Sequence, residues 1–232
     1  MREVGAIIFD FDGVLIESEY LGNVQLARTL TALGYPTSVE QALLQFTGLG
    51  GPDFTLAVER WIGGTIPQAF HDDRAAEDAR VMREGIEAVS GAIDFVRGLP
   101  ALLPKAIASS SSTRWITTHL DHIGLAGVFA DHLYSGREHV VRGKPAPDIY
   151  LHAAKSLGVA IEHALIIEDS PVGVTGAVAS GAMVVGLAVG RHCADGHDDL
   201  LRRHGATQVV HSFAEIAALY PGVVADPRIT AA

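Results

Sequence analysis

Short apolar runs that alternate with helical patterns constrain the fold of this chain more than any other feature of its sequence. The first run covers residues 5–9 and stops abruptly at Asp10, as a strand buried on both faces of a parallel sheet would. Similar runs recur at residues 105–108, 133–134, 165–167, 183–187 and 208–210, with helical patterns between them at residues 113–123, 147–157, 171–180 and 195–204. This alternation predicts an α/β fold with a doubly wound, mostly parallel, Rossmann-like sheet and right-handed crossovers.

A long helical stretch separates the first two predicted strands. From residue 14 to about residue 98 the sequence carries helical patterns (residues 20–33, 39–46, 54–61 and 72–89) and no comparable β-prone run. Since a single crossover needs only about a dozen residues, we expect residues 16–91 to form a helical cap inserted into an α/β core of residues 1–15 and 92–225. The hinges should lie near residues 15–19 and 89–94, and residues 226–232 should form a frayed tail.

The charge balance excludes several classes of partner. The 232-residue chain has 27 Asp and Glu against 17 Lys and Arg, a net charge of −10, and no segment concentrates basic residues. Neither a nucleic acid nor an anionic membrane is therefore an expected partner. The most apolar run, residues 182–189, is far shorter than the roughly 20 residues that span a bilayer. Asp10 and Asp12 interrupt the N-terminal run, which argues against a signal peptide. The single cysteine, Cys193, forms no internal disulfide, and we expect a cytoplasmic protein.

Acidic, hydroxyl and ammonium side chains follow the predicted strands at the points where these strands end. They are Asp10 and Asp12 after the first strand, Ser109 to Ser112 after the second, Lys144 on the loop beyond residues 133–134, and Glu168 and Asp169 after the strand at residues 165–167. Ligands of open α/β sheets bind outside the carboxyl ends of the strands. We therefore expect these side chains to converge on one edge of the sheet.

Four carboxylates at one sheet edge repel one another unless a cation lies between them. Oxygen ligands suit a hard divalent cation, and Mg²⁺ is the natural candidate. A carboxylate that the metal leaves free can act as a nucleophile or as a general acid and base. The Lys144 ammonium can neutralise both a nucleophile and a phosphoryl group. The Ser109 hydroxyl and the following backbone N–H groups, at the start of a helix, can bind an anion.

Each of these features has a simpler structural explanation when it stands alone. An Asp-x-Asp-Gly segment can simply form a turn, a serine can simply cap a helix, and a lysine can simply be a solvated surface residue. Their joint occurrence at predicted strand ends favours the catalytic interpretation. Two groups of histidines have no such supporting motif. His119 with His122, and His192 with Cys193 and His197, lack a complete structural zinc pattern. No zinc site is therefore expected.

Four motifs stand at the predicted strand ends: Asp10-Phe11-Asp12-Gly13-Val14, Ser109, Lys144 within Gly-Lys-Pro-x-Pro-Asp, and Glu168-Asp169-Ser170-x-x-Gly173. Together they resemble the haloacid dehalogenase-like hydrolases, in particular the branch of sugar-phosphate phosphatases and β-phosphoglucomutases, which carries a helical cap after the first strand. The segment that follows Gly13 also looks like this branch, with Glu17 where Asp is usual. The resemblance spans roughly residues 7–213.

The resemblance implies catalytic roles for three residues. Asp10 would be the nucleophile that forms an aspartyl phosphate. Asp12 would protonate the leaving alcohol and then activate water, and Lys144 would bridge Asp10 and the phosphate. An acid at Asp12 disfavours a dehalogenase, whose leaving halide needs no proton. The absence of lysine from residues 15–95 argues against Schiff-base phosphonate cleavage.

The resemblance also implies binding roles. The expected metal ligands are Asp10, Asp12 through its backbone carbonyl, Glu168 and Asp169, and the expected phosphate contacts are Ser109, Ser110 and Lys144. The expected cofactor is Mg²⁺. Cap and hinge contacts to the substrate are expected from Ser18, Glu19, Gly48 and Gly51.

The choice between a phosphatase and a mutase depends on the cap. Mutases of the branch carry Thr and His where Ser18 and Gly22 stand, and they place a basic residue in the cap loop that is uncharged here, residues 48–51. We therefore expect a Mg²⁺-dependent phosphatase that hydrolyses a small phosphomonoester with a polar, uncharged remainder, such as a sugar or polyol phosphate.

Two alternatives stay open. The first is a β-phosphoglucomutase-like phosphosugar mutase, and the second is a non-catalytic sensor of a phosphorylated metabolite, because fold alone does not fix function. In each case the expected partner is a small phosphorylated metabolite. The sequence leaves the oligomeric state open and is compatible with a monomer.

Overall fold

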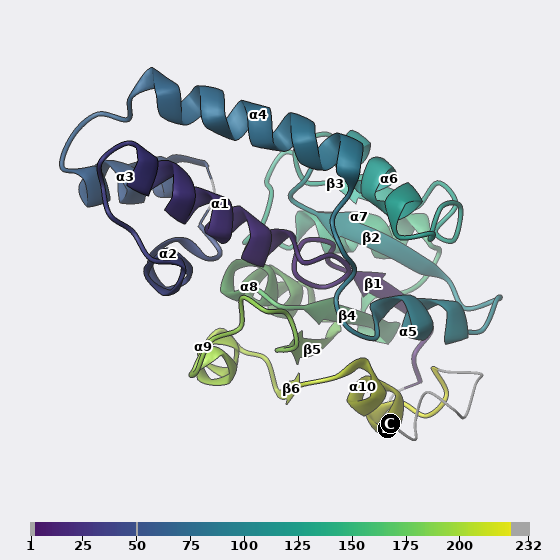
Figure 1. Cartoon of the computed structure of the whole chain (residues 1–232). Helices are drawn as coiled ribbons and strands as arrows, with labels where there is room; N and C mark the ends of the chain where they lie inside the picture. Colours follow the sequence, from purple (N-terminus) through teal and green to yellow (C-terminus); the bar gives the residue numbers. More distant parts are fainter. Residues whose placement is uncertain (1–2, 50, 224–232) are drawn as a thin grey trace.

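A six-stranded parallel sheet forms the centre of the molecule in the computed structural model, which describes residues 3–49 and 51–223. The strands lie in the order β3-β2-β1-β4-β5-β6 (Figure 1). Their bounds are β1 Ala6–Phe9, β2 Lys105–Ser109, β3 Leu133–Ser135, β4 Ala164–Glu168, β5 Met183–Leu187 and β6 Gln208–Val210. Every neighbouring pair is parallel. The predicted α/β fold with a doubly wound parallel sheet is confirmed.

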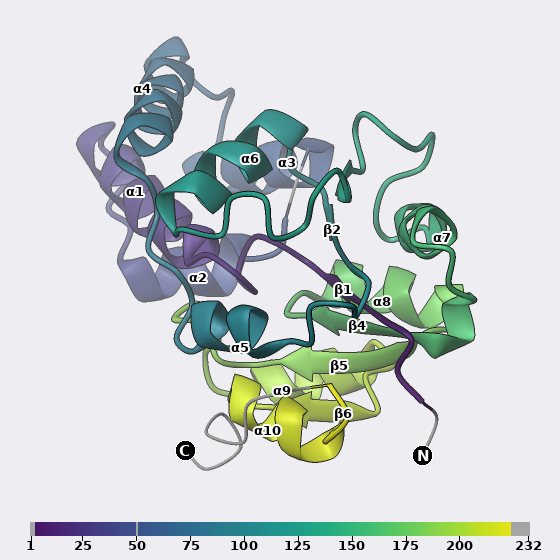
Figure 2. The ribbon, with the colours of Figure 1, turned by 90° about the vertical axis from the view of Figure 1, so that its right-hand side faces the viewer.

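Helices cover both faces of the sheet (Figures 1 and 2). One face carries α5 (Ala92–Gly98), α6 (Thr113–His122) and α10 (Phe213–Leu219), and the other carries α7 (Asp148–Ser156), α8 (Pro171–Ser180) and α9 (His197–Arg203). A short 3₁₀ turn, Ile161–His163, precedes β4. Along β1, Phe9 packs toward the first face and Ile8 toward the second, because successive side chains of a strand point to opposite sides. Burial on both faces explains the unbroken apolar runs.

Four helices lie together beside the sheet, on the side of its carboxyl edge (Figure 1). They are α1 (Ser18–Ala32), α2 (Val39–Phe46), α3 (Gly51–Ile62) and α4 (Gln68–Glu84). They enclose a hydrophobic cluster of their own around Leu26, Leu30, Phe46 and Phe70. The division into core and cap at residues 15–16 and 91–92 stays a prediction, and the tail predicted at residues 226–232 lies outside the described residues.

The helix predicted over residues 72–89 is wrong at both ends, because α4 spans Gln68–Glu84. Gly85 ends the helix with a φ of 83°, a left-handed conformation that favours glycine. The chain then becomes extended, and Ala88 forms an antiparallel bridge with Ile16. The two connections between the sheet and α1–α4 therefore lie side by side. Within the part of the chain described here, none of the helices has the length and apolar character that crossing a membrane requires.

Serine caps begin two helices at the carboxyl edge of the sheet. At the start of α6, Ser112 Oγ accepts the N–H of Trp115 at 3.2 Å. At the start of α8, Ser170 Oγ accepts the N–H of Gly173 at 3.0 Å, and Pro171 occupies the first helical position. These caps fix the sharp turns by which the chain leaves β2 and β4.

Candidate active site

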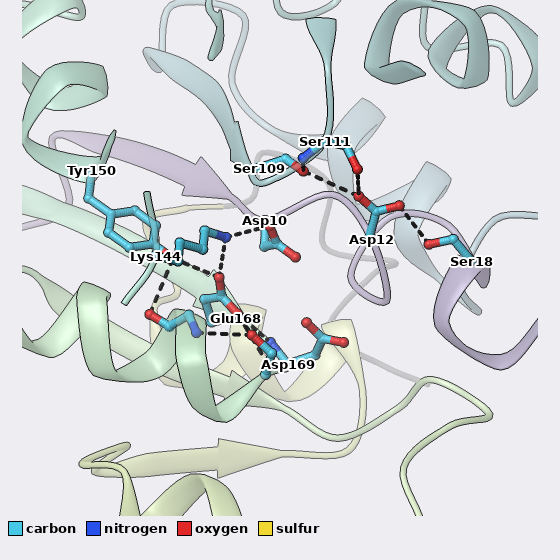
Figure 3. Close-up of polar contacts among 11 residues, drawn as sticks. Asp10, Asp12, Ser18, Ser109, Ser111, Lys144, Tyr150, Glu168 and Asp169 are labelled. Atoms are coloured by element: carbon cyan, nitrogen blue, oxygen red, sulfur yellow. Dashed lines mark hydrogen bonds and ion pairs between the residues drawn. The ribbon is translucent and has the colours of Figure 1, made fainter. Parts of the chain in front are cut away.

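Lys144 joins two carboxylates at the carboxyl edge of the sheet. Its Nζ donates to Asp10 Oδ1 and to Glu168 Oε1, each at 2.5 Å (Figure 3). Asp10 follows β1 directly, and Glu168 is the last residue of the adjacent strand β4. The Lys144 side chain is only 4% exposed. These charges therefore interact where little water screens them.

Glu168 is fully buried, and donors occupy both of its carboxylate oxygens. The Tyr150 hydroxyl donates to Oε1 at 2.6 Å, beside the bond from Lys144. Oε2 accepts the backbone N–H groups of Asp169 and Ser170 at 3.1 and 3.2 Å and the Ser170 hydroxyl at 3.0 Å. Glu168 is thus held in one orientation, and it holds Lys144 beside Asp10.

The buried charges shift one another's pKa values. Burial raises the pKa of Asp10 despite the opposing effect of Lys144, with help from repulsion by Glu168 and Asp169. Burial by itself would lower the pKa of Lys144, but its partners Asp10 and Glu168 raise it. Three carboxylates share one ammonium here, and a bound cation would neutralise the excess negative charge.

Asp169 brings the third carboxylate to this cluster and is 1% exposed. One carboxylate oxygen from each of Asp10, Glu168 and Asp169 lies within 4.8 Å of the others. The Oδ1 atom of Asp169 is buried and has no hydrogen-bond partner among the described residues, which is costly unless a cation satisfies it. A hard divalent ion with oxygen ligands fits this donor set.

Two histidines from the β5–α9 region hold Asp169. His192 Nε2 lies 2.8 Å from Asp169 Oδ2, and His197 Nε2 donates to the Asp169 backbone carbonyl at 2.7 Å. Burial lowers the pKa of both imidazoles, so both are neutral near pH 7. These contacts orient Asp169 without adding a positive charge to the cluster.

The Asp12 carboxylate points away from Lys144 and toward the start of α1 (Figure 3). Its Oδ1 accepts the Ser18 hydroxyl at 2.7 Å and the Trp115 indole N–H at 3.0 Å. Its Oδ2 accepts the Ser111 hydroxyl at 2.6 Å and the Ser109 hydroxyl at 3.2 Å. Asp12 thus lies between the first turn of α1 and the loop that follows β2.

Two glycines allow the chain to pass close to these carboxylates. At Gly13, where φ is 83°, a Cβ atom would collide with Asp169 Oδ2. At Gly173, a Cβ atom would collide with the Glu168 carboxylate. The glycines of the first and last sequence motifs are therefore required by the packing around the acidic cluster.

The structure brings most of the predicted site residues together. Asp10, Lys144, Glu168 and Asp169 form one buried cluster (Figure 3). Ser109 is 1% exposed at the end of β2 and contacts Asp12, as described above.

The predicted cap and hinge residues divide into two groups. Ser18 donates to Asp12, and the backbone N–H of Gly48 acts to lower the pKa of the Glu19 carboxyl. Burial and the nearby Asp169 carboxylate raise the pKa of Glu19 from 4.5 to about 7. Gly51, at the start of α3, has open space around its Cα.

Ser110, a predicted phosphate contact, is exposed and makes no side-chain hydrogen bond within the described part of the chain.

Five further residues contact the predicted ones: Ser111, Trp115, Tyr150, His192 and His197. The sequence assigns no separate role to Ser111 and considers the two histidines only as part of a zinc group, which it does not favour. Ser111 belongs to the predicted serine run, which does not show which hydroxyl faces Asp12. Trp115 lies in the first turn of α6, where helical side chains point back toward the strand end. His192 lies on the loop after β5 and His197 begins α9, and the sequence does not show that this segment returns to Asp169.

Known proteins are similar to this chain in sequence and in fold. The family model of the haloacid dehalogenase-like hydrolases matches residues 4–181. Hexitol phosphatase A of Escherichia coli is 30% identical over 90% of this chain and 91% of its own length. A β-phosphoglucomutase of Mycobacterium tuberculosis is 36% identical over 93% of this chain and 92% of its own. A hydrolase of the same family from Deinococcus radiodurans, solved with bound phosphate and sodium, superimposes with a TM-score of 0.83 at 32% identity, over 96% of this chain and 97% of its own.

A buried cluster of carboxylates with one lysine, at the carboxyl edge of a parallel sheet, is typical of an active site in an α/β enzyme. The chain belongs to the haloacid dehalogenase-like hydrolases. Both the resemblance drawn from the motifs and the prediction of a hydrolase are confirmed.

Proposed function

We propose that the protein is a Mg²⁺-dependent phosphatase that hydrolyses a small sugar or polyol phosphate through an aspartyl-phosphate intermediate. The observation that carries this proposal is the bond from Lys144 Nζ to Asp10 Oδ1, beside the Asp169 carboxylate. Similarity to a hexitol phosphatase supports the substrate class. The phosphate bound to the Deinococcus relative supports a phosphate site in this fold.

Asp10 and Asp169 would hold Mg²⁺ through their side chains, and Asp12 would contribute its backbone carbonyl. The donors on both Glu168 oxygens favour a different role for this residue, which is to orient Lys144. Bound Mg²⁺ would stabilise the charge that develops on the phosphoryl oxygens.

In the first step a carboxylate oxygen of Asp10 attacks phosphorus, and the bond between phosphorus and the substrate alcohol oxygen breaks. Asp12 donates a proton to that oxygen, so a neutral alcohol leaves. The Lys144 ammonium and the Ser109 hydroxyl stabilise the phosphoryl oxygens during the transfer. The product of this step is the aspartyl phosphate of Asp10.

In the second step a water molecule attacks the aspartyl phosphate. Asp12, now ionised, takes the proton from this water, and the bond between phosphorus and Asp10 breaks. Inorganic phosphate leaves, and both aspartates return to their starting states. Asp12 must turn from its bonds with Ser18, Ser111 and Trp115 to reach the reacting atoms.

The helices α1–α4 would act as the cap, since α1 begins six residues after Asp12 and its first turn carries Ser18 and Glu19. Gly48, whose N–H acts to lower the pKa of Glu19, would complete the wall that faces the substrate. These groups are polar, and the carboxyl of Glu19 suits the hydroxyl groups of a sugar or polyol better than a second phosphate.

Release of inorganic phosphate from a panel of sugar, polyol and nucleoside phosphates tests the proposal. At least one substrate should be hydrolysed with Mg²⁺ and not with EDTA. Asp10→Asn should lower kcat at least about 10³-fold, while the exposed Lys155→Met variant should retain full activity. Full turnover by Asp10→Asn, with folding verified by circular dichroism, would refute the role of Asp10.

A phosphosugar mutase is the second candidate, because the β-phosphoglucomutase of Mycobacterium tuberculosis is 36% identical to this chain. A mutase must keep its bisphosphate intermediate and protect the aspartyl phosphate from water. It would convert a sugar 1-phosphate to the 6-phosphate when primed with a sugar bisphosphate, with little release of phosphate. If free phosphate is the main product, the protein is a phosphatase and not a mutase.

A further inference from the structure

A histidine–cysteine–histidine cluster contacts Asp169. It consists of His192 and Cys193, on the loop after β5, and His197, the first residue of α9, and one ligand atom from each lies within 4.8 Å of the others. The sequence alone gave no reason to expect a metal here, because the spacing matches no complete zinc pattern. The fold brings a candidate fourth ligand to this group, because His192 also contacts Asp169.

The distances around His192 Nε2 suit a metal ion. Cys193 Sγ lies 3.4 Å from this nitrogen, and tetrahedral zinc, with Zn–N of about 2.0 Å and Zn–S of about 2.3 Å, separates its nitrogen and sulfur ligands by about 3.6 Å. Asp169 Oδ2 lies 2.8 Å from the same nitrogen. This contact must open by roughly 0.5 Å for both atoms to bind one zinc ion.

A single hydrogen bond satisfies these atoms poorly, because one N–H would be shared between a carboxylate oxygen and a sulfur, which is only a weak acceptor. His192 Nε2 faces both Asp169 Oδ2 and Cys193 Sγ, and one ring nitrogen holds either one proton or one lone pair. A divalent cation in place of that proton contacts the nitrogen, the sulfur and the oxygen together.

His197 makes the kind of hydrogen bond through one ring nitrogen that often accompanies metal binding by the other. Its Nε2 donates to the Asp169 backbone carbonyl at 2.7 Å. Since a carbonyl only accepts, the proton of the neutral ring is on Nε2, and Nδ1 carries the free lone pair. A backbone carbonyl that fixes the second nitrogen of a histidine is a usual companion of metal ligation.

We propose that His192, Cys193 and His197 form a second metal site, selective for a borderline-soft divalent cation such as Zn²⁺, with Asp169 Oδ2 as the fourth ligand. Thiolate and imidazole ligands favour Zn²⁺ over Mg²⁺, whereas the carboxylates around Asp10 favour Mg²⁺. Binding displaces the thiol proton of Cys193 to solvent, since the thiolate is the ligand.

One consequence rests on the proposed phosphatase function. A cation on Oδ2 of Asp169 draws electron density from the carboxylate whose Oδ1 would hold Mg²⁺. Zn²⁺ at the second site therefore opposes the activity that Mg²⁺ supports, so the two metals act against each other through one aspartate.

Titration of the metal-free full chain with Co²⁺, in excess Mg²⁺ and without oxygen, tests the site directly. Cys193 is the chain's single cysteine, so a near-ultraviolet thiolate-to-cobalt charge-transfer band can report on no other thiol. The band should saturate at one Co²⁺ per chain and disappear when Zn²⁺ is added. Cys193→Ser should abolish it, and His197→Gln should weaken Co²⁺ binding at least about tenfold.

Three outcomes would overturn the site: no band, a band unchanged in His197→Gln, or saturation at half an equivalent, which indicates a thiol shared by two chains. The absorption readout does not depend on phosphatase activity, so its result stands if the proposed function fails.

Where activity is found, Zn²⁺ should inhibit the wild type more strongly than Cys193→Ser, whose activity with Mg²⁺ alone should be unchanged. Equal inhibition of both would refute the antagonism.

Discussion

Replacement of Lys144 by methionine tests the charge balance of the buried cluster without measuring catalysis. Methionine keeps much of the aliphatic length of lysine but leaves Asp10 and Glu168 without their shared cation. Removing one partner of a buried ion pair costs about 3–5 kcal/mol. Lys144 serves two carboxylates and is 4% exposed, so we expect the upper part of that range for Lys144→Met. For a chain of this size the loss corresponds to a fall in Tm of roughly 10–15 °C.

The pH dependence of this loss gives the sharper test. The folded-state pKa values of Asp10 and Asp169 are raised above 3.8, so these groups favour the folded state at low pH and lose this contribution as the pH rises through the raised values. Lys144 limits the rise, and its removal shifts both pKa values further upward. The destabilisation by Lys144→Met should therefore be small near pH 4 and grow toward pH 8.

Urea unfolding in EDTA at pH 5 and pH 8 measures both effects, with exposed Lys155→Met as the matched control. Adding Glu168→Gln removes one of the stranded carboxylates, so the double variant should recover about 1–3 kcal/mol relative to additivity. A loss below about 1 kcal/mol for Lys144→Met at pH 8, or a loss that is smaller at pH 8 than at pH 5, would contradict the interpretation of this cluster as a buried ion-pair network.

Three further predictions use the same unfolding assay or steady-state kinetics. Mg²⁺ at 100 times its Kd should stabilise the wild type by about 2.7 kcal/mol, and Asp169→Asn should lose most of this stabilisation. Equal stabilisation of both proteins would show that Mg²⁺ binds at another site. Trp115→Phe removes the hydrogen bond from the indole to Asp12 and should cost about 1.5–3 kcal/mol of stability. It should not lower kcat, because that bond must break before Asp12 reaches the substrate. A tenfold fall in kcat would show that the bond is needed in the reaction. Glu19, whose pKa rises from 4.5 to about 7, favours the folded state below pH 4.5 and loses this effect as the pH passes 7. Metal-free Glu19→Gln should therefore gain stability relative to the wild type between pH 5 and pH 8, by at most about 3 kcal/mol, and a flat difference would show that Glu19 is solvated.

The strand ends could be predicted from the sequence because burial makes them conspicuous. Runs with no polar residue ended at Asp10 and just before Glu168, and neighbouring parallel strands bring their carboxyl ends to the same edge. Lys144 is a different case, since β3 is not adjacent to β1 in the sheet. Its place beside Asp10 depends on the path of the loop after β3, where Gly136 N–H bonds to Ser109 O. The expectation that Lys144 reaches the site came from the chemistry of the motif.

Other contacts leave no periodic signal in the sequence. The amphipathic pattern predicts a helix that continues to residue 89, yet α4 ends at Glu84, and Ile86 and Val89 are buried where the chain is extended. Trp115 meets Asp12 only because the Ser112 cap sets the direction of α6. Such contacts depend on how elements are oriented in three dimensions, which the order of residues along one element does not specify.

The charge of the cluster sets an order for what can bind there. Asp10, Glu168 and Asp169 carry three negative charges when ionised, and Lys144 carries one positive charge, so the buried set has a charge of −2 within a chain of net charge −10. A phosphate monoester adds up to two more negative charges, which one lysine cannot balance in a site with little water. A divalent cation cancels the excess first and leaves the Lys144 ammonium free to attract the incoming phosphoryl group. Cation before phosphate ester is therefore the binding order that this arrangement of charges favours.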